Sequence, residues 1–311
     1  MSPCLLDSVG EFNVFAWMRM SRLFEGVHSF YSVDMGSLNR EEQKKVILEL
    51  YARFHHASYL EWDPLSVIRE FRGKPDQEYV ALVSALFAFG GVKQIIASVR
   101  NAIGRIGLVE RPGIIGRETE SLTDCLSGFR HRIYVDQDLV HLTLLYQESC
   151  QRYGSLKEHF LIHHDPADPT IERGLTGLIR DYRHWSATQV HRPGAHFGHM
   201  LNSPEGGSTC KRWLMFLKWM VRPDDGIDLG LWSDTPLLRT DQLLIPLDTH
   251  LFKISRKLGL TRKKTANWAA ALEVTRKLKA LDPEDPTRFD FALCRFGMLD
   301  YRGLTGYART R

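Results

Sequence analysis

The stretch from Leu244 to Leu260, reading LIPLDTHLFKISRKLGL, decides how the C-terminal third of this 311-residue chain is built. Pro246 keeps the apolar entry extended, because a proline disfavours helical backbone in the residue before it. The apolar residues of the helix that follows recur at positions i, i+3 and i+7 and are Leu251, Ile254 and Leu258. Asp248 stands at the N-cap of this helix and Gly259 at its C′ position. The stretch therefore predicts an amphipathic helix with a carboxylate held at its positive end.

Apolar residues recur at helical spacing along most of the chain from Asn39 onward, and β-branched alternation is nearly absent. A short helix is expected after Asp63-Pro64, and longer ones at residues 41–59, 76–90, 92–106, 138–153, 156–163, 169–183, 209–222, 248–258, 267–281 and 286–298. The fold is predicted to be all-α. Residues 1–38 show no sustained period, and we expect them to form a loosely packed N-terminal extension.

Composition excludes several classes of protein. With 43% apolar residues the chain is expected to fold, and no run approaches the roughly 20 apolar residues that a membrane span needs. The N-terminus lacks the pattern of a secretory leader, which favours a cytoplasmic protein. Five cysteines without a C-x-x-C pair indicate reduced thiols rather than a disulfide framework, a zinc site or an iron–sulfur cluster.

Positive charge is concentrated in the C-terminal third. Residues 205–311 hold 19 Lys and Arg against 13 Asp and Glu, a net of +6, whereas residues 1–204 hold 22 against 24, a net of −2. This asymmetry suits contact with a phosphate backbone, although a solvated surface of mixed charge has the same composition.

On local sequence alone, Asp248 is most simply a helix cap. Its neighbours suggest more, because an apolar stretch precedes it and Thr249, His250 and a helix bearing Lys253 and Arg256 follow it. A fixed carboxylate can stabilise a cationic sugar while nearby cations hold phosphates, which is what a glycosidic-bond enzyme acting on a polyanion requires.

The segment Pro246-Leu247-Asp248-Thr249-His250-Leu251, with Arg256 and Leu258-Gly259-Leu260, resembles the Asp-containing segment of the helix-hairpin-helix DNA glycosylases. The resemblance implies two helical subdomains with a cleft between them, a DNA duplex with a damaged base as partner, no cofactor or metal, and a catalytic role for Asp248. We place one subdomain, containing the hairpin, at residues 75–230 and the other at residues 39–74 plus 240–311. We also expect a monomer.

Members of that superfamily that also cleave the strand carry a nucleophilic lysine on the second helix of the hairpin. The matching place here is the run from Glu205 to Trp213, where Gly206 and Gly207 lead into Lys211. A helix N-terminus disfavours a cation, which would favour the neutral amine needed for attack. We predict Lys211 as the nucleophile over Lys218, whose position is explained by a long side chain extending toward solvent.

Several features depart from the superfamily pattern. The short L-P-G-V-G-x-K hairpin is not reproduced, and Lys211 and Asp248 are 248 − 211 = 37 residues apart, closest to the archaeal 8-oxoguanine glycosylase branch. The four-cysteine cluster of endonuclease III-like members is missing. From Asn39 onward the chain also resembles a bacterial family of conserved proteins without an assigned activity, through segments such as Trp62-Asp63-Pro64-Leu65 and Cys210-Lys211-Arg212.

By resemblance, Lys93 or Gln94 would wedge into the duplex, although a plain surface turn explains them as well. The run Phe129-Arg130-His131-Arg132 mixes an aromatic ring with cations that would stack on a flipped base or grip phosphate, or it simply ends a loop. The full set of predicted DNA contacts is Gly206, Gly207, Lys93, Gln94, Arg130, Arg132, Arg212, His250, Lys253 and Arg256.

The sequence thus predicts a base-excision glycosylase with AP-lyase activity that acts on a damaged base such as an oxidised purine. Two alternatives stay open. One is a protein of the same fold that binds nucleic acid without catalysis. The other is a metal hydrolase using the histidines of the polar segment 184–199, which are His184, His191, His196 and His199, although no metal-binding pattern orders them.

Overall fold

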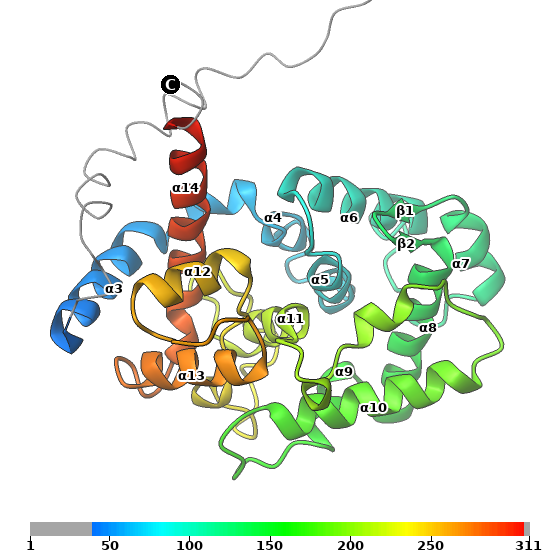
Figure 1. The fold of residues 1–311 in the computed structure, drawn as a ribbon. Coiled ribbons are helices and arrows are strands. Elements are labelled where there is room, and N and C mark those ends of the chain that lie inside the picture. Colours follow the sequence, from blue (N-terminus) through cyan, green and yellow to red (C-terminus); the bar gives the residue numbers. More distant parts are fainter. Residues whose placement is uncertain (1–38, 308–311) are drawn as a thin grey trace, which may run out of the picture.

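The computed structural model describes residues 39–307 of the chain, with side chains through residue 298, so the predicted extension at residues 1–38 lies outside the described part. Helices make up almost all of its regular structure (Figure 1). They are α3 (Arg40–Phe54), α4 (Leu65–Arg69), α5 (Gln77–Leu86), α6 (Val92–Ile106), α7 (Thr119–Leu126), α8 (Asp136–Tyr153), α9 (Leu156–Leu161), α10 (Glu172–Thr188), α11 (Lys211–Val221), α12 (Thr249–Lys257), α13 (Trp268–Lys279) and α14 (Asp290–Tyr307).

Short 3-10 turns and one strand pair connect these helices. The turns are η2 (Ala57–Trp62), η3 (Phe197–Leu201), η4 (Pro204–Gly206), η5 (Thr240–Gln242) and η6 (Pro286–Phe289). Strands β1 (Arg130–His131) and β2 (Tyr134–Val135) pair antiparallel. The prediction of a predominantly helical fold is confirmed. No helix in the described range 39–307 is long and apolar enough to cross a membrane.

Local capping explains where several helices begin. The Asn39 side chain accepts hydrogen bonds from the backbone amides of Glu41 and Glu42, and the Glu42 carboxylate accepts one from the amide of Asn39. This reciprocal arrangement satisfies amides that have no partner within α3. Asp248 caps α12 by accepting one hydrogen bond from the amide of Leu251, as the sequence predicted.

Two apolar cores hold the molecule together. The first is built mainly from α4 to α11 and extends to Leu244, and the second is built from α3, α12, α13, η6 and α14. Figure 1 shows α11 between the helices of the first core and the group formed by α12, α13 and α14. Residues 60–71 pack in the first core, although the sequence placed all of residues 39–74 in the second subdomain.

A long connection separates α10 from α11. Residues 189–210 contain η3 and η4, and they end in two left-handed residues, Gly207 with φ 69° and Cys210 with φ 47°. The Trp213 indole donates to the Met200 carbonyl at 2.7 Å, which fastens the first turn of α11 to this connection. The start of α11 is therefore fixed by a long, packed loop rather than by a short hairpin.

A buried group of charges links α11 to the second core. Lys218 on α11 is 1% exposed, and its Nζ lies 2.9 Å from Asp228 Oδ1 and 3.2 Å from Asp290 Oδ2 at the start of α14. Arg222, one turn further on, also pairs with Asp228 and bonds both carboxylate oxygens of Asp285 at 2.9 and 3.1 Å. The cluster of Lys218, Arg222, Asp228, Asp285 and Asp290 is called the buried ion cluster below.

We predict that Lys218→Met lowers the free energy of unfolding by about 3–5 kcal/mol, because it leaves Asp228 and Asp290 buried with one counter-charge fewer. Urea denaturation followed by circular dichroism measures the change. Arg100→Met is the control, because the Arg100–Glu70 pair is exposed on both sides and should cost less than about 1 kcal/mol. Equal losses in the two variants would contradict the structural importance given to the cluster.

Candidate active site

Lys211 and Asp248 meet although 37 positions separate them in the sequence. Lys211 is the first residue of α11, Asp248 is the N-cap of α12, and Lys211 Nζ lies 3.6 Å from Asp248 Oδ2. The lysine side chain is 29% exposed and the aspartate side chain 13%. A basic and an acidic group therefore face each other at a place that solvent reaches.

Each oxygen of Asp248 has a separate partner. Oδ1 accepts the Leu251 amide at 2.8 Å, which fixes the carboxylate at the positive end of α12. Oδ2 faces Lys211 Nζ and also lies 3.9 Å from the Cys294 thiol. Burial raises the pKa of Cys294 well above its ordinary value, and the neighbouring carboxylate of Asp248 adds to this, so the thiol stays neutral.

The Lys211 amine also contacts the backbone that follows α5. Its Nζ donates to the Ala88 carbonyl at 3.3 Å. The amine is thus held between the end of α5, in the first core, and Asp248, in the second. This contact is long for a hydrogen bond, so little free energy is lost when the amine moves toward another group.

Lys218, the alternative nucleophile, occupies a different environment. Its burial lowers the pKa of the amine, but Asp228 and Asp290 raise it more, so the pKa lies above its ordinary value. An ammonium held between two carboxylates in the core cannot act as a nucleophile without breaking the buried ion cluster. The structure therefore places Lys211 beside Asp248 and Lys218 in a structural role.

Asp290 was not foreseen from the sequence, and it pairs with Lys218 at the start of α14. Burial raises its pKa to about 6; Lys218 opposes this, and Asp228 and Asp248 add to it. It lies one helical turn from Cys294 on α14, since residues four apart share a helix face. In the sequence, the one sign of this arrangement is the i, i+4 spacing of Asp290 and Cys294. The partner of Asp290, Lys218, lies on a distant element.

Phe89, also not singled out from the sequence, lies beside the Lys211 contact at Ala88. It is half-buried, and the guanidinium groups of Arg132 and Arg212 lie 5.3 and 5.6 Å from the centre of its ring. Arg212 is held by the protein itself, because it donates to the Leu86 carbonyl at 2.9 Å and to the Tyr134 hydroxyl and the His199 carbonyl. Arg132 is exposed and has left-handed backbone with φ 54°.

The remaining predicted contacts lie on the surface or close to it. Lys93 and Gln94 are exposed in the first turn of α6, with Lys93 Nζ 5.7 Å from the centre of the Trp62 ring. Arg130 is exposed on β1, whereas the adjacent His131 is fully buried and stacks on Phe87.

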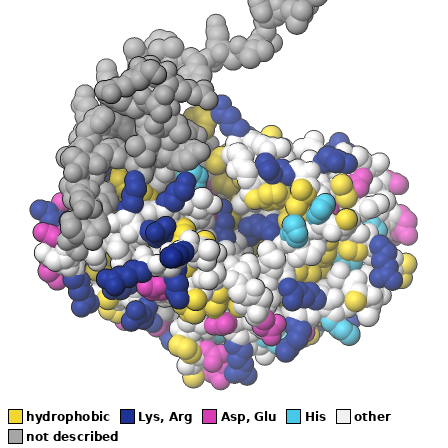
Figure 2. Space-filling view, in the orientation of Figure 1, with side chains coloured by type: hydrophobic (Ala, Val, Ile, Leu, Met, Phe, Trp, Pro, Cys, Tyr) yellow, Lys and Arg dark blue, Asp and Glu magenta, His cyan; other side chains and the backbone are white. Residues whose placement is uncertain are grey.

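Gly206 and Gly207 are exposed, and the Gly207 carbonyl accepts the Trp268 amide at 3.1 Å, so this loop touches the start of α13. Cations gather over α12 and α13 on the face shown in Figure 2. Lys253 and Arg256 are exposed and His250 is half-buried. The exposed run Arg262-Lys263-Lys264 follows α12.

The four histidines of segment 184–199 do not form a group of metal ligands. The rings of His196 and His199 lie 5.8 Å apart, whereas His191 stacks at 5.9 Å on His141, outside the segment. Among the residues whose side chains the structure describes, the one group of three or more suitable ligands is His159, His163 and Asp181, at the packing of α9 and α10. Sequence reasoning did not find this group.

The chain belongs to the family described as protein of unknown function (DUF2400), whose model matches residues 63–299. That range includes Lys211, Asp248 and the whole buried ion cluster. No curated protein and no solved structure matches the chain. The family assignment therefore names no activity, and a function has to be argued from the site.

We predict that Asp290 makes the protein more stable as the pH falls from about 6 toward 4. Because the folded state holds the Asp290 proton more tightly than the unfolded state, the free energy of unfolding rises as that proton binds, by at most about 3 kcal/mol. Urea denaturation of the wild type and of Asp290→Asn at several pH values isolates the contribution of Asp290 protonation to the free energy of unfolding. Parallel pH profiles for the two proteins would contradict the prediction.

Proposed function

We propose that this member of the DUF2400 family is a DNA glycosylase with AP-lyase activity, in which Lys211 is the nucleophile and Asp248 its catalytic partner. The observation that carries the proposal is the 3.6 Å approach of Lys211 Nζ to Asp248 Oδ2 at the accessible start of α11. The proposal also rests on the resemblance of the Pro246–Leu251 segment to helix-hairpin-helix glycosylases.

In the proposed reaction Asp248 first accepts a proton from the Lys211 ammonium. The neutral amine then attacks C1′ of an extruded nucleotide, and the bond between C1′ and the base nitrogen breaks, with its electron pair leaving on the base. The base takes up the proton that Asp248 received from Lys211, so Asp248 is a carboxylate again. Positive charge that develops on the sugar ring is stabilised by the Asp248 carboxylate, which the Leu251 amide already holds in position. The bond between C1′ and O4′ then breaks, O4′ takes the proton that the attacking nitrogen loses, and the Lys211 Schiff base forms. Loss of a proton from C2′ breaks the bond between C3′ and its oxygen, and the 3′ phosphate leaves.

The surroundings of the pair suit this chemistry. Cys294 beside Asp248 is neutral, and Lys211 is the cation with which the carboxylate exchanges a proton. Phe89, flanked by two guanidinium groups, offers an aromatic surface on which an unstacked base can pack. Exposed cations on and after α12 are placed to neutralise phosphates of the flanking strand.

The second candidate function is binding of nucleic acid without catalysis. It is favoured by the same exposed cations, Lys253, Arg256 and Arg262-Lys263-Lys264, which require no reactive amine. The two functions differ in one respect that is measurable. A pure binding protein would tolerate loss of Lys211 and of Asp248, whereas the glycosylase would not.

Borohydride trapping on duplex DNA containing oxidised purine or an abasic site tests the proposal directly. We expect the native chain to form a covalent adduct that Lys211→Gln does not form, because the Schiff base requires this amine. Asp248→Asn should slow adduct formation by about 10²-fold or more while leaving stability nearly unchanged, since asparagine caps a helix as well as aspartate. Lys45→Gln, on the exposed face of α3, is the control and should trap like the native chain.

Absence of an adduct with the native chain across a panel of lesions would overturn the glycosylase proposal. If Lys211→Gln still forms the adduct, the nucleophile is another lysine. Lys218→Gln also belongs in the series, and loss of trapping in that variant is meaningful only where its folding is unchanged.

Binding of undamaged duplex tests the cationic surface separately from catalysis. We expect affinity to fall steeply with salt, and Arg256→Ala to reduce the slope of log K against log[salt] by about one, because each phosphate contact releases about one counterion. Fluorescence anisotropy over a series of salt concentrations gives both slopes. Arg152→Ala is the control, since its guanidinium pairs with Glu148 on α8, far along the chain from this surface. Identical slopes for Arg256→Ala and the native chain would remove Arg256 from the interface.

A further inference from the structure

A second group of chemically active side chains lies where α9 packs on α10. His159 Nε2 and His163 Nε2 lie 3.2 and 2.7 Å from the same oxygen of Asp181, Oδ2. His159 is fully buried, and His163 and Asp181 are 19% and 25% exposed. The close packing depends on α10, because a Cβ at Gly177 would lie 2.3 Å from Cγ of His163.

Hydrogen bonding at Ser149 indicates which nitrogen of His159 carries a proton. The Ser149 hydroxyl lies 3.1 Å from the Leu145 carbonyl, 2.9 Å from the Tyr182 hydroxyl and 2.9 Å from His159 Nδ1. The hydroxyl has a single hydrogen, and both the Leu145 carbonyl and the Tyr182 hydroxyl are placed to accept it. When that hydrogen points to either of them, the Ser149 oxygen can only accept from His159. The arrangement therefore favours a proton on Nδ1 of His159.

With the proton on Nδ1, the contact of the other nitrogen of His159, Nε2, with Asp181 lacks a hydrogen. In neutral imidazole with a proton on Nδ1, the Nε2 atom carries a lone pair, and this lone pair faces the Asp181 oxygen at 3.2 Å. Two acceptors at that distance repel each other unless a cation lies between or beside them. The cation is a second proton on His159, a protonated His163 at the same oxygen, or a metal ion.

We propose that His159, His163 and Asp181 form a binding site for a divalent transition-metal ion of the zinc class. Two imidazole nitrogens and one carboxylate oxygen are ligands that Zn²⁺ accepts, and the three donor atoms lie within 4.8 Å of one another. Ligand atoms around a tetrahedral ion with bonds of about 2 Å lie roughly 3.3 Å apart, so the 2.7 Å contact of His163 with Asp181 lengthens when the ion binds. Ser149 holds Nδ1 of His159, the outer-shell contact that orients metal-bound histidines.

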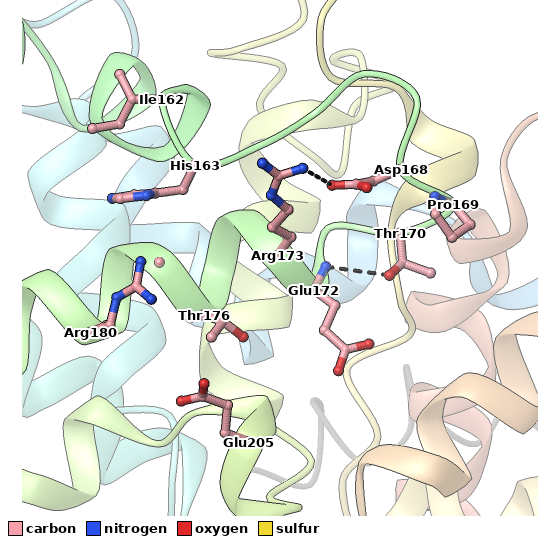
Figure 3. Close-up of a pocket in the computed structure, with 11 residues that line it drawn as sticks. Ile162, His163, Asp168, Pro169, Thr170, Glu172, Arg173, Thr176, Arg180 and Glu205 are labelled. Atoms are coloured by element: carbon pink, nitrogen blue, oxygen red, sulfur yellow. Dashed lines mark hydrogen bonds and ion pairs between the residues drawn. The ribbon is translucent and has the colours of Figure 1, made fainter.

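The site opens on a cavity that is separate from the Lys211–Asp248 pair. His163 lies in the wall of a pocket of about 570 Å³ between α9, α10 and η4, which is also lined by Arg173, Arg180 and Glu205 (Figure 3). Three protein ligands leave a position of a tetrahedral ion vacant for water or another ligand, and His163 brings that position toward the pocket. The inference is independent of the proposed glycosylase function, since neither Lys211 nor Asp248 takes part.

Titration of the purified full-length chain with Co²⁺ tests the site. Tetrahedral Co²⁺ has visible absorption bands that are much stronger than those of octahedral aqueous Co²⁺. We expect one equivalent to produce these bands and one equivalent of Zn²⁺ to abolish them. His163→Gln and Asp181→Asn should each lose the bands. Ser149→Ala should weaken affinity by about 10- to 100-fold by releasing His159 Nδ1. His184→Gln, an exposed histidine on the same helix α10, is the matched control and should bind like the native chain.

Two results would overturn the proposal. One is the absence of tetrahedral bands at one equivalent in the native chain, which would leave a protonated, hydrogen-bonded His–Asp–His group. The other is unchanged binding in both His163→Gln and Asp181→Asn. Circular dichroism melts in chelator confirm that each variant is folded, and either ligand variant suffices for the comparison if the other fails to fold.

Discussion

The ion pairs of Lys218 with Asp228 and Asp290 are the constraint on which the arrangement of the two cores depends. They join α11, which packs in the first core, to α14, which packs in the second. Removing these charges from water costs several kcal/mol per ion, so the cluster contributes little net stability compared with apolar packing. The cluster instead determines how α11 is placed against α14, because any other placement would leave charges buried and unpaired.

This constraint reaches the candidate active site through the geometry of α11. Lys211 and Lys218 are seven residues apart, about two helical turns or roughly 10 Å along one face. The buried end of that face is held by Asp290, and the open end presents Lys211 to Asp248. A shift of one residue along the helix would turn both lysines by about 100°, so fixing Lys218 also fixes Lys211.

The parts of this arrangement that could be predicted from sequence are those encoded locally. Asp248 as an N-cap and the stripe of α12 follow from neighbouring residues, and the structure has both. Helix α11 was expected at residues 209–222 and begins at Lys211. The approach of Lys211 to Asp248 was inferred from resemblance alone. The partners of Lys218 could not be inferred, because Asp228 and Asp290 reach it from other elements and a lysine on a helix has no local mark of burial.

Short elements and distributed ligand sets were missed for a related reason. Helix α7 and the β1–β2 pair are too short to show a period. His159 and His163 do stand at i and i+4, a spacing that places two imidazoles on one side of the chain, but Asp181 follows 18 residues later on α10. The metal site was instead considered at the histidines of segment 184–199. A sequence shows where histidines are frequent, but it does not show which side chains meet in the folded protein.

The two lysine–carboxylate systems are kept apart by one neutral side chain. Asp290 and Cys294 are successive members of one face of α14, and they meet Lys218 and Asp248 respectively. Because burial keeps the Cys294 thiol protonated, it interposes no charge between the systems. Asp290 is committed to Lys218, so Asp248 faces Lys211 without a competing cation from the cluster. That separation allows one helix to carry a structural lysine at one end and an accessible amine beside a carboxylate at the other.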